Sequence, residues 1–290
     1  MTLLLRTVLT AVLAFASAGS LAAAAAAVVE AVQMPAWLER GGKQTPVAAG
    51  TALFASDELR TGAAARLYVK LAEGSLVKLG ENASLRLSDL EPDRGGVFRA
   101  ALNVVVGAFR FTTDVLGKNR RRDVKITVAT VTAGVRGTDL WGRSETNRQI
   151  VCLIEGAIEV GAEGEKPVTM NQPRQFYQRD QGKTQPLSVI SKERLAELAR
   201  ETEIEPGNGA ARRGGKWKVT LARAGSRDAV LAVYDSVRLA GYAARIRAAG
   251  EGAKRVYAVQ IGGLSSKTEA EALAARLRGR HGIQETAVSN

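Results

Sequence analysis

Apolar and polar residues alternate over most of the first two thirds of the chain. Residues 66–71 show the pattern clearly, because leucine or valine occupies every second position. The same period of two recurs around Val77, Phe109 and Ile158, and turns rich in glycine separate the runs. Many short strands divided by turns are typical of an all-β domain, which we place at residues 31–187.

The last stretch of the chain carries one pattern twice. Val219 and Leu221 alternate with polar or small residues, and forty positions later Val259 and Ile261 do the same. A serine follows each run, and an apolar stripe with the spacing i, i+3, i+4, i+7 follows each serine. Such a stripe predicts an amphipathic helix that lies on a sheet. The serines are Ser226 and Ser266, and the stripes are Val230, Val233, Tyr234, Val237 and Ala270, Leu273, Ala274, Leu277.

Two further alternating runs, at residues 243–248 and 284–289, complete this C-terminal unit. The predicted order over residues 216–290 is therefore β-α-β-β-α-β, the ferredoxin-like or RNP-like arrangement. In this fold both helices cover one face of the sheet and leave the other face open. Ser266 and Glu269 have the spacing of a capping box at the start of the second helix. The whole chain is predicted to be a multidomain α+β protein.

The segment between the two units differs in composition from both. Residues 191–203 are interpreted as a short charged helix, and residues 205–215 are rich in glycine. Glycine-rich composition predicts a flexible linker. We assign residues 188–215 to this short helix and linker, and we expect the two domains to be tethered rather than tightly packed.

The first residues have the pattern of a secretory signal peptide. Residues 7–29 carry no charge, and the small residues at 22–27 offer A-x-A cleavage sites, among them residues 25–27. We assign residues 1–27 to the signal peptide. The alternative is an uncleaved anchor, since the uncharged run is long enough to span a bilayer. Either way we expect the body of the protein outside the cytoplasm, and after cleavage we expect no stable membrane span.

Few residues are suited to catalysis. The chain has one histidine, His281, and one cysteine, Cys152, in different predicted domains. A zinc site or a cysteine–histidine nucleophile is therefore not expected, and no phosphate-binding glycine loop follows a strand. Cys152 is interpreted as a core residue and His281 as a surface residue at a helix end. We expect a protein that is not an enzyme and has no cofactor and no metal.

Two charged features are open to two interpretations each. Residues 118–123 (KNRRRD) form the densest charge run, and a solvated loop is the first interpretation. Binding of anionic lipid or wall polymer is the second. Arg136 and Asp139 are interpreted as a pair that stabilises a turn, with a functional pair as the alternative.

Positive charge is concentrated in the C-terminal unit. Residues 212–290 hold 15 lysines and arginines against 6 acidic residues, a balance of +9 out of +12 for the whole chain. Such a field favours acidic or polyanionic partners. Alternation along the strands places long hydrogen-bond donors on the open face, where arginine can bind a carboxylate through two parallel bonds. The candidate binding residues are Lys218, Thr220, Arg245, Arg247 and Gln260, with Ala258 between them.

Residues 216–290 resemble the SPOR domain, a small peptidoglycan-binding module of bacterial envelope proteins. The resemblance rests on the duplicated element order, the turn at Gly241-Tyr242 and the run YAVQIGGL at residues 257–264. It implies that the open face binds glycan strands stripped of their stem peptides, and that the protein is periplasmic, with the division septum as a suggested address. The first strand departs from the family, since Thr220 stands where a glutamine is usual and residues 222–224 replace a Gly-x-Phe turn.

Residues 31–187 resemble the FecR domain, a periplasmic all-β module. The matching motifs are DELRTG at 57–62, AEGS at 72–75, VKLG at 77–80, TAGVRGTD at 132–139 and EGAIEV at 155–160. In the regulator that gives this family its name, a cytoplasmic segment before the membrane span controls a sigma factor. We expect nothing before the signal peptide here, and hence no direct control of a sigma factor. The resemblance implies an interaction module for a periplasmic or outer-membrane protein.

Three functions remain open at this point. The first is a non-catalytic envelope protein that binds peptidoglycan through the SPOR-like domain and presents the FecR-like domain. The second is an envelope signalling or assembly factor that acts through the FecR-like domain. The third is nucleic-acid binding, since RNA-recognition domains share the β-α-β-β-α-β layout. We expect no nucleic-acid partner, because the predicted open face lacks the aromatic residues on which bases stack.

Overall fold

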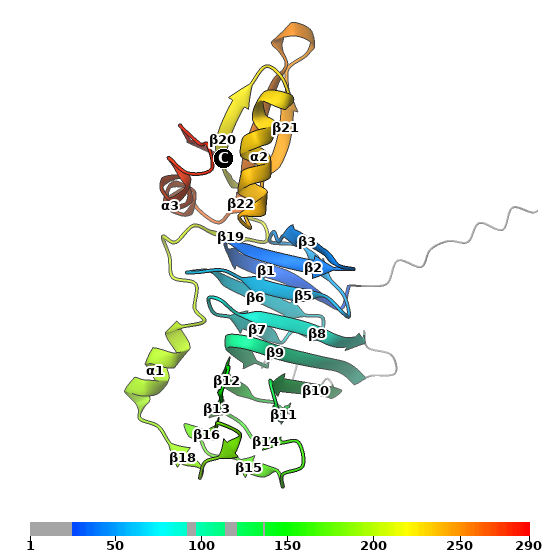
Figure 1. Ribbon diagram of the computed structural model, residues 1–290, viewed down its shortest axis with the longest axis vertical. Coiled ribbons are helices and arrows are strands. Elements are labelled where there is room, and N and C mark those ends of the chain that lie inside the picture. Colours follow the sequence, from blue (N-terminus) through cyan, green and yellow to red (C-terminus); the bar gives the residue numbers. More distant parts are fainter. Residues whose placement is uncertain (1–24, 92–96, 114–120, 136) are drawn as a thin grey trace, which may run out of the picture.

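The computed structural model describes residues 25–91, 97–113, 121–135 and 137–290, which form two domains stacked end to end (Figure 1). The N-terminal domain is built of strands and the C-terminal domain of strands and two helices (Figure 1). The signal peptide expected at residues 1–27 lies almost wholly outside the described residues. Within the described ranges, no helix is long and apolar enough to cross a membrane.

The strands of the N-terminal domain are short and closely spaced along the chain. They are β1 (Ala27–Gln33), β2 (Ala36–Arg40), β3 (Lys43–Pro46), β4 (Ala52–Leu53), β5 (Glu58–Thr61), β6 (Arg66–Leu71), β7 (Leu76–Leu79), β8 (Ser84–Glu91), β9 (Val97–Thr112), β10 (Arg121–Val128), β11 (Val131–Val135), β12 (Asp139–Glu145), β13 (Arg148–Glu155), β14 (Ile158–Ala162), β15 (Val168–Met170), β16 (Gln175–Asp180), β17 (Lys183–Thr184) and β18 (Ser188–Val189). The turns between them fall where the sequence predicts breaks. Gly74 and Gly156, for example, both have positive φ, the conformation that favours glycine.

These strands form two sheets that face each other. Sheet A has the order β1-β6-β7-β9-β12-β13-β16, and sheet B has the order β3-β2-β5-β8-β9-β10-β11-β14-β15. Apolar side chains fill the space between them. Leu67 and Val69 of β6 are fully buried, as are Phe109 and Phe111 of β9. Burial of one such side chain contributes about 1.5–3 kcal/mol, and the predicted all-β domain is confirmed.

Strand β9 joins the two sheets. Its first half pairs with β8 and, in parallel, with β10 in sheet B, whereas its second half pairs with β7 and β12 in sheet A. Gly107 lies where the strand passes between the sheets and has a φ of +90°. A Cβ atom there would lie 2.5 Å from Ala83, so only glycine fits this crossing.

A segment after the last strands of the N-terminal domain runs back over the outer face of sheet A. It contains α1 (Lys192–Arg200), whose start is capped by the Ser191 side chain. Leu198 of this helix packs against Trp141 and Cys152, which are fully buried. The short charged helix expected at residues 191–203 is therefore present, and it covers part of the sheet instead of extending into solvent.

The C-terminal domain has the predicted β-α-β-β-α-β order. Its elements are β20 (Trp217–Ala224), α2 (Asp228–Leu239), β21 (Arg245–Ala249), β22 (Val256–Leu264), α3 (Lys267–Leu277) and β23 (Ala287–Ser289), with one 3-10 turn (Gly252–Lys254). The strand order in the sheet is β21-β22-β20-β23. Both helices pack on β20 and β22, and Val230, Val237, Leu273 and Leu277 of the predicted stripes are buried. The fold predicted for residues 216–290 is confirmed.

The connection between the domains is ordered, which differs from the flexible linker expected within residues 188–215. Residues 210–212 form β19 (Ala210–Arg212), which pairs with β1 on one side and with β22 on the other. The Glu269 carboxylate accepts hydrogen bonds from the backbone N–H groups of Gly207 at 2.7 Å and Ala210 at 2.8 Å. Ser266 caps α3 as predicted, but the Glu269 side chain bonds to the linker rather than completing a capping box.

The domains also pack directly against each other at the β1–β2 corner. The backbone N–H of Ala36 donates to the Gly241 carbonyl at 3.0 Å, and the Trp37 indole donates to the Leu239 carbonyl at 3.4 Å. Arg276 of α3 donates to the Met34 carbonyl at 3.1 Å. The expectation of loosely tethered domains is therefore wrong. The composition of the linker predicts only the flexibility of that segment. These contacts are made by residues far away in the sequence, which the composition of the linker does not include.

Strand β1 begins inside the segment assigned to the signal peptide. Ala27 pairs with Leu71 and Leu53, and the Ala26 carbonyl accepts a hydrogen bond from Ala72 N–H at 2.9 Å. Both alanines are buried. Cleavage after residue 27 would remove these contacts, so the boundary of the folded domain lies earlier than the sequence pattern places it.

Candidate functional site

The predicted open face of the C-terminal sheet is present, and cross-strand register brings its polar residues together. Arg245 lies opposite Gln260, which in turn lies opposite Thr220. Arg247 lies opposite Ala258 on the same face. The apolar partners Val219, Ile246, Val259 and Ile261 point to the other side, where the helices pack.

Four of the five candidate residues line one cleft of about 270 Å³. These four are Lys218, Arg245, Arg247 and Gln260. Thr220 is different, because its side chain is only 4% exposed and its hydroxyl accepts a hydrogen bond from the Gln260 amide at 3.0 Å. The expected role of Thr220 as a solvent-facing donor is therefore wrong. It orients Gln260, and Gln260 faces the cleft.

Arg223 is a basic residue of this face that strand alternation does not predict. Strict alternation along β20 would place Ala222 on the open face. The register of β20 against β22 shifts between Thr220 and Ala222, so Leu221 is an extra residue in a bulge. Beyond the bulge Ala222 packs toward the core and Arg223 lies opposite Ala258, exposed on the open face.

The arginines of this face have no acidic partner within the described part of the chain. Among the described residues, neither hydrogen bonds nor ion pairs engage the guanidinium groups of Arg223, Arg245 and Arg247. Lys218 differs from these arginines, because its ammonium group donates a hydrogen bond to the backbone oxygen of Asn290 at 3.1 Å. Several uncompensated cations on one concave face attract an anionic group, and arginine binds carboxylates with two parallel hydrogen bonds.

The cleft is closed on one side by the N-terminal domain. The residues that line it from this side are Val32 of β1, Met34 just after β1, Ala48 and Ala49 of the turn after β3, and Ala211 of β19. The open face is therefore not a free surface at this end. It meets an apolar wall that belongs to the other domain.

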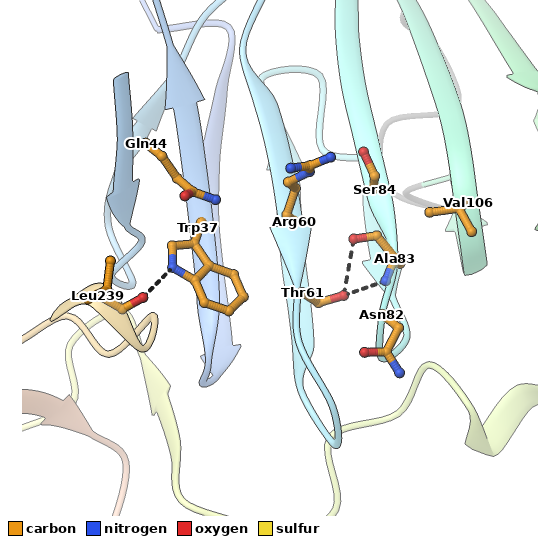
Figure 2. A pocket seen from close by; sticks show the side chains of 9 residues that line it. All are labelled: Trp37, Gln44, Arg60, Thr61, Asn82, Ala83, Ser84, Val106 and Leu239. Carbon is orange, nitrogen blue, oxygen red and sulfur yellow. Dashed lines mark hydrogen bonds between the residues drawn. The ribbon is translucent and has the colours of Figure 1, made fainter. Parts of the chain in front are cut away.

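A second hollow, of about 330 Å³, lies on the outer side of sheet B where α2 ends (Figure 2). The Trp37 ring forms one side of it, and Leu239, which is 83% exposed, lies beside the indole (Figure 2). Arg60 and Gln44 extend over the neighbouring strands (Figure 2). The Thr61 hydroxyl is bonded to the backbone of Gly80 and Ala83 and is not free to bind a ligand.

An ion-pair network lies on the outer face of sheet A, under the segment that follows α1. Lys78 donates to the Glu203 carboxylate at 2.6 Å and 2.8 Å, and the Tyr68 hydroxyl donates to it at 2.8 Å. Burial raises the pKa of Glu203, but the hydrogen bonds from Lys78 and Tyr68 and the charges of Lys78 and Arg110 outweigh it, so this pKa lies below its ordinary value. The network fastens the segment to the sheet.

Asp139 belongs to the same network. Arg110 donates two hydrogen bonds to its carboxylate, at 2.9 Å and 2.7 Å, from the neighbouring strand β9. Asp139 therefore forms a cross-strand ion pair with Arg110. Arg136, the partner expected for Asp139, lies outside the described residues, as do residues 118–120 of the charged run, whereas residues 121–123 belong to β10 rather than to a loop.

The two residues considered for catalysis are placed as the sequence predicts. Cys152 is fully buried, and burial raises the pKa of its thiol to about 12. His281 lies after α3, with its Nδ1 atom 3.3 Å from the Ser236 hydroxyl. In the part of the chain that the structure describes, no cluster of histidine, cysteine and acidic residues has the arrangement of a metal site.

Two family models match separate parts of the chain. A family model described as "FecR protein" matches residues 57–159, and a "SPOR domain" model matches residues 214–289. No curated protein sequence matches. Two crystal structures, each described as "a putative anti-sigma factor from Parabacteroides distasonis ATCC 8503", are similar at low scores. The structure at 1.65 Å is 13% identical to this chain and has a TM-score of 0.38. The match covers 69% of this chain and 97% of the chain in that structure. The structure at 2.50 Å is 10% identical and has a TM-score of 0.41. This match covers 76% of this chain and 89% of the chain in that structure.

Proposed function

Because the chain joins a FecR domain to a SPOR domain, we propose that it is a non-catalytic periplasmic protein that binds peptidoglycan through the basic face of the SPOR domain. Both families consist of binding domains rather than catalytic ones. A SPOR domain implies contact with peptidoglycan. The finer proposal is that the ligand is the glycan strand after removal of its stem peptides, and that Arg223, Lys218, Arg245, Arg247 and Gln260 bind it.

The observation that carries this proposal is that Arg223, Arg245 and Arg247, which have no acidic partner among the described residues, lie on one face with an oriented amide. Removal of stem peptides leaves lactyl carboxylates along the glycan, and Arg245 and Arg247 offer paired donors for such groups. Gln260 supplies a donor and an acceptor for sugar hydroxyls or acetamido groups. Thr220 fixes the orientation of this amide through the hydrogen bond at 3.0 Å.

Nucleic acid is the less favoured ligand of the same face. Single-stranded RNA and DNA are usually bound by stacking bases on aromatic side chains. The centre of this face presents Ala258 and Gln260, and Tyr257 packs toward the core instead. Charge attracts both polymers, whereas the lack of a stacking platform favours a sugar chain.

The FecR domain is proposed to present an interaction surface to a periplasmic or outer-membrane protein. With stripped glycan enriched where the wall is being split, the division septum is the proposed address. An envelope signalling or assembly role through the FecR domain is compatible with this address and is the second candidate. It is favoured by the hollow beside Trp37, which is formed by residues of both domains.

Co-sedimentation with sacculi tests the proposal. The full chain is expected to bind sacculi more tightly after an amidase has removed the stem peptides. The double substitution of Arg245→Ala and Arg247→Ala is expected to weaken binding at least about tenfold, since each charge-assisted contact is worth roughly 1.5–3 kcal/mol. Arg227→Ala with Arg280→Ala is the matched control, because both are exposed arginines that do not line the cleft. Equal binding by both folded double variants would refute the assignment of this face.

A further inference from the structure

The cleft on the basic face has two walls of opposite character. One wall is polar and basic and comes from β20, β21 and β22 of the SPOR domain. The other wall is apolar and comes mainly from the N-terminal domain, where Met34, Ala48 and Ala49 face the cleft. A sugar ring has the same division, with C–H groups on its faces and hydroxyl or carboxylate groups at its edge. Sites that bind small polar ligands typically combine such apolar walls with a few placed polar groups.

The position of the apolar wall is fixed by the contacts between the domains. Strand β19 connects β1 to β22 by backbone pairing, and Ala211 of β19 itself lines the cleft. The Ala243 N–H lies 3.4 Å from the Met34 sulfur atom, so the wall is held against the SPOR domain at a second point. The two walls are therefore pre-organised, and a ligand does not have to bring the domains together.

The floor of the cleft leaves backbone uncovered. Gly262 and Gly263 lie at a register shift between β22 and β20. A Cβ atom at Gly262 would meet no atom closer than the Lys218 Cβ atom at 4.0 Å. The space above Gly262 is therefore open, and a ligand can approach the strand closely there.

We infer that the cleft binds one carboxylate-bearing sugar unit of the glycan between these two walls, so that the FecR-side residues Met34, Ala48 and Ala49 are part of the glycan site. This inference rests on the proposed function and extends it. The cleft volume of about 270 Å³ lies just below the roughly 300–1,000 Å³ of sites for drug-sized ligands, which suits a single unit. Arg245, Arg247 and Lys218 face the carboxylate, and the apolar wall contacts the sugar ring.

Substitution of Ala48 in the full chain tests the wall directly, with amidase-stripped glycan strands as the probe. Ala48→Glu places a carboxylate in the cleft, where it competes with that of the sugar, and is expected to weaken binding about tenfold. Ala48→Gln has the same size without the charge and is expected to weaken binding about threefold. Ala55→Glu is the control, because Ala55 is an exposed alanine of the same domain that does not line the cleft, and it is expected to bind normally.

The outcomes separate this inference from the proposed function. Unchanged binding in both Ala48 variants, together with weak binding in the double arginine variant, would overturn the shared site and leave the basic face as the glycan site. Equal weakening by Ala48→Glu and Ala48→Gln would overturn the assignment of a carboxylate. Unchanged binding in the arginine variant would instead reject the proposed function itself. Thermal unfolding of each variant confirms that binding is compared between folded proteins.

Discussion

Replacement of Glu269 by glutamine is the most direct test of how the two domains are joined. Glu269 lies in the first turn of α3 and is 6% exposed. Its two carboxylate oxygens accept from Gly207 N–H at 2.7 Å and Ala210 N–H at 2.8 Å. Glutamine keeps the shape of the side chain. It offers one acceptor oxygen, and its NH₂ group opposes the second backbone N–H, donor to donor.

The expected loss of stability follows from these contacts. A hydrogen bond to a charged group contributes roughly 1.5–3 kcal/mol, and an unsatisfied buried donor costs a similar amount. The negative charge at the start of α3 adds about 0.3–1 kcal/mol through the helix dipole. The free energy of unfolding of the full chain should therefore fall by about 2–4 kcal/mol, a large fraction of the roughly 5–15 kcal/mol typical of a protein domain.

Urea unfolding and hydrogen exchange measure this effect. Beyond the lower stability, the amides of Gly207 and Ala210 should exchange faster, because the linker opens first. Glu271→Gln is the matched control, since Glu271 is exposed on the same helix and pairs with Lys267 at 3.4 Å. Such a surface pair contributes at most about 1 kcal/mol. Equal stability of the two variants, or unchanged exchange at the two linker amides, would refute the reasoning.

Three further predictions concern other parts of the chain. Cys152 should not react with thiol reagents until the protein unfolds, because it is buried and its pKa is raised to about 12; rapid labelling of native protein would contradict its placement under α1. The pairing of Glu203 should stabilise the fold above its ordinary pKa of 4.5 and be lost as the pH falls through its lowered folded-state value. The stability difference between the natural chain and Glu203→Gln should therefore shrink in acid, and a constant difference from pH 7 to pH 3 would argue against the network. If the leader is removed, the mature chain should begin at or before Ala26, because its carbonyl bonds to Ala72; an intact mass that starts at Val28 would show the opposite.

The C-terminal fold was predictable because its elements are specified by local patterns. The apolar residues at 230–237 and 270–277 have a spacing that places them on one side of a helix. The strand runs have a period of two. The open face was predicted from that same alternation, and Arg245, Arg247 and Gln260 lie on it as expected. A period of two predicts the face toward which each side chain points only while the strand stays regular.

The departures from prediction arise where a contact comes from far away in the chain. Alternation counts residues and contains no signal for the bulge at Leu221, so it places Ala222 where Arg223 lies. Composition describes residues 205–215 as flexible, whereas their order is imposed by Glu269, which is 59 residues from Ala210. The apolar wall of the cleft has the same origin, since it is contributed by a domain that begins almost two hundred residues earlier in the sequence.

Strand β19 determines how a glycan bound in the proposed cleft would orient the FecR domain. It pairs with β1 at Ala31–Gln33 and with β22 at Leu264, so sheet A continues into the sheet of the SPOR domain. A domain on a flexible tether samples many orientations around its attachment point. A domain attached through a strand, a buried carboxylate and the Met34 corner samples few. Binding of glycan in the proposed cleft would therefore orient the outer face of sheet B, with its hollow at Trp37, relative to the cell wall. A partner of the FecR domain would then meet a surface with a fixed orientation relative to the cell wall. A domain on a flexible tether would not present its surface in one orientation.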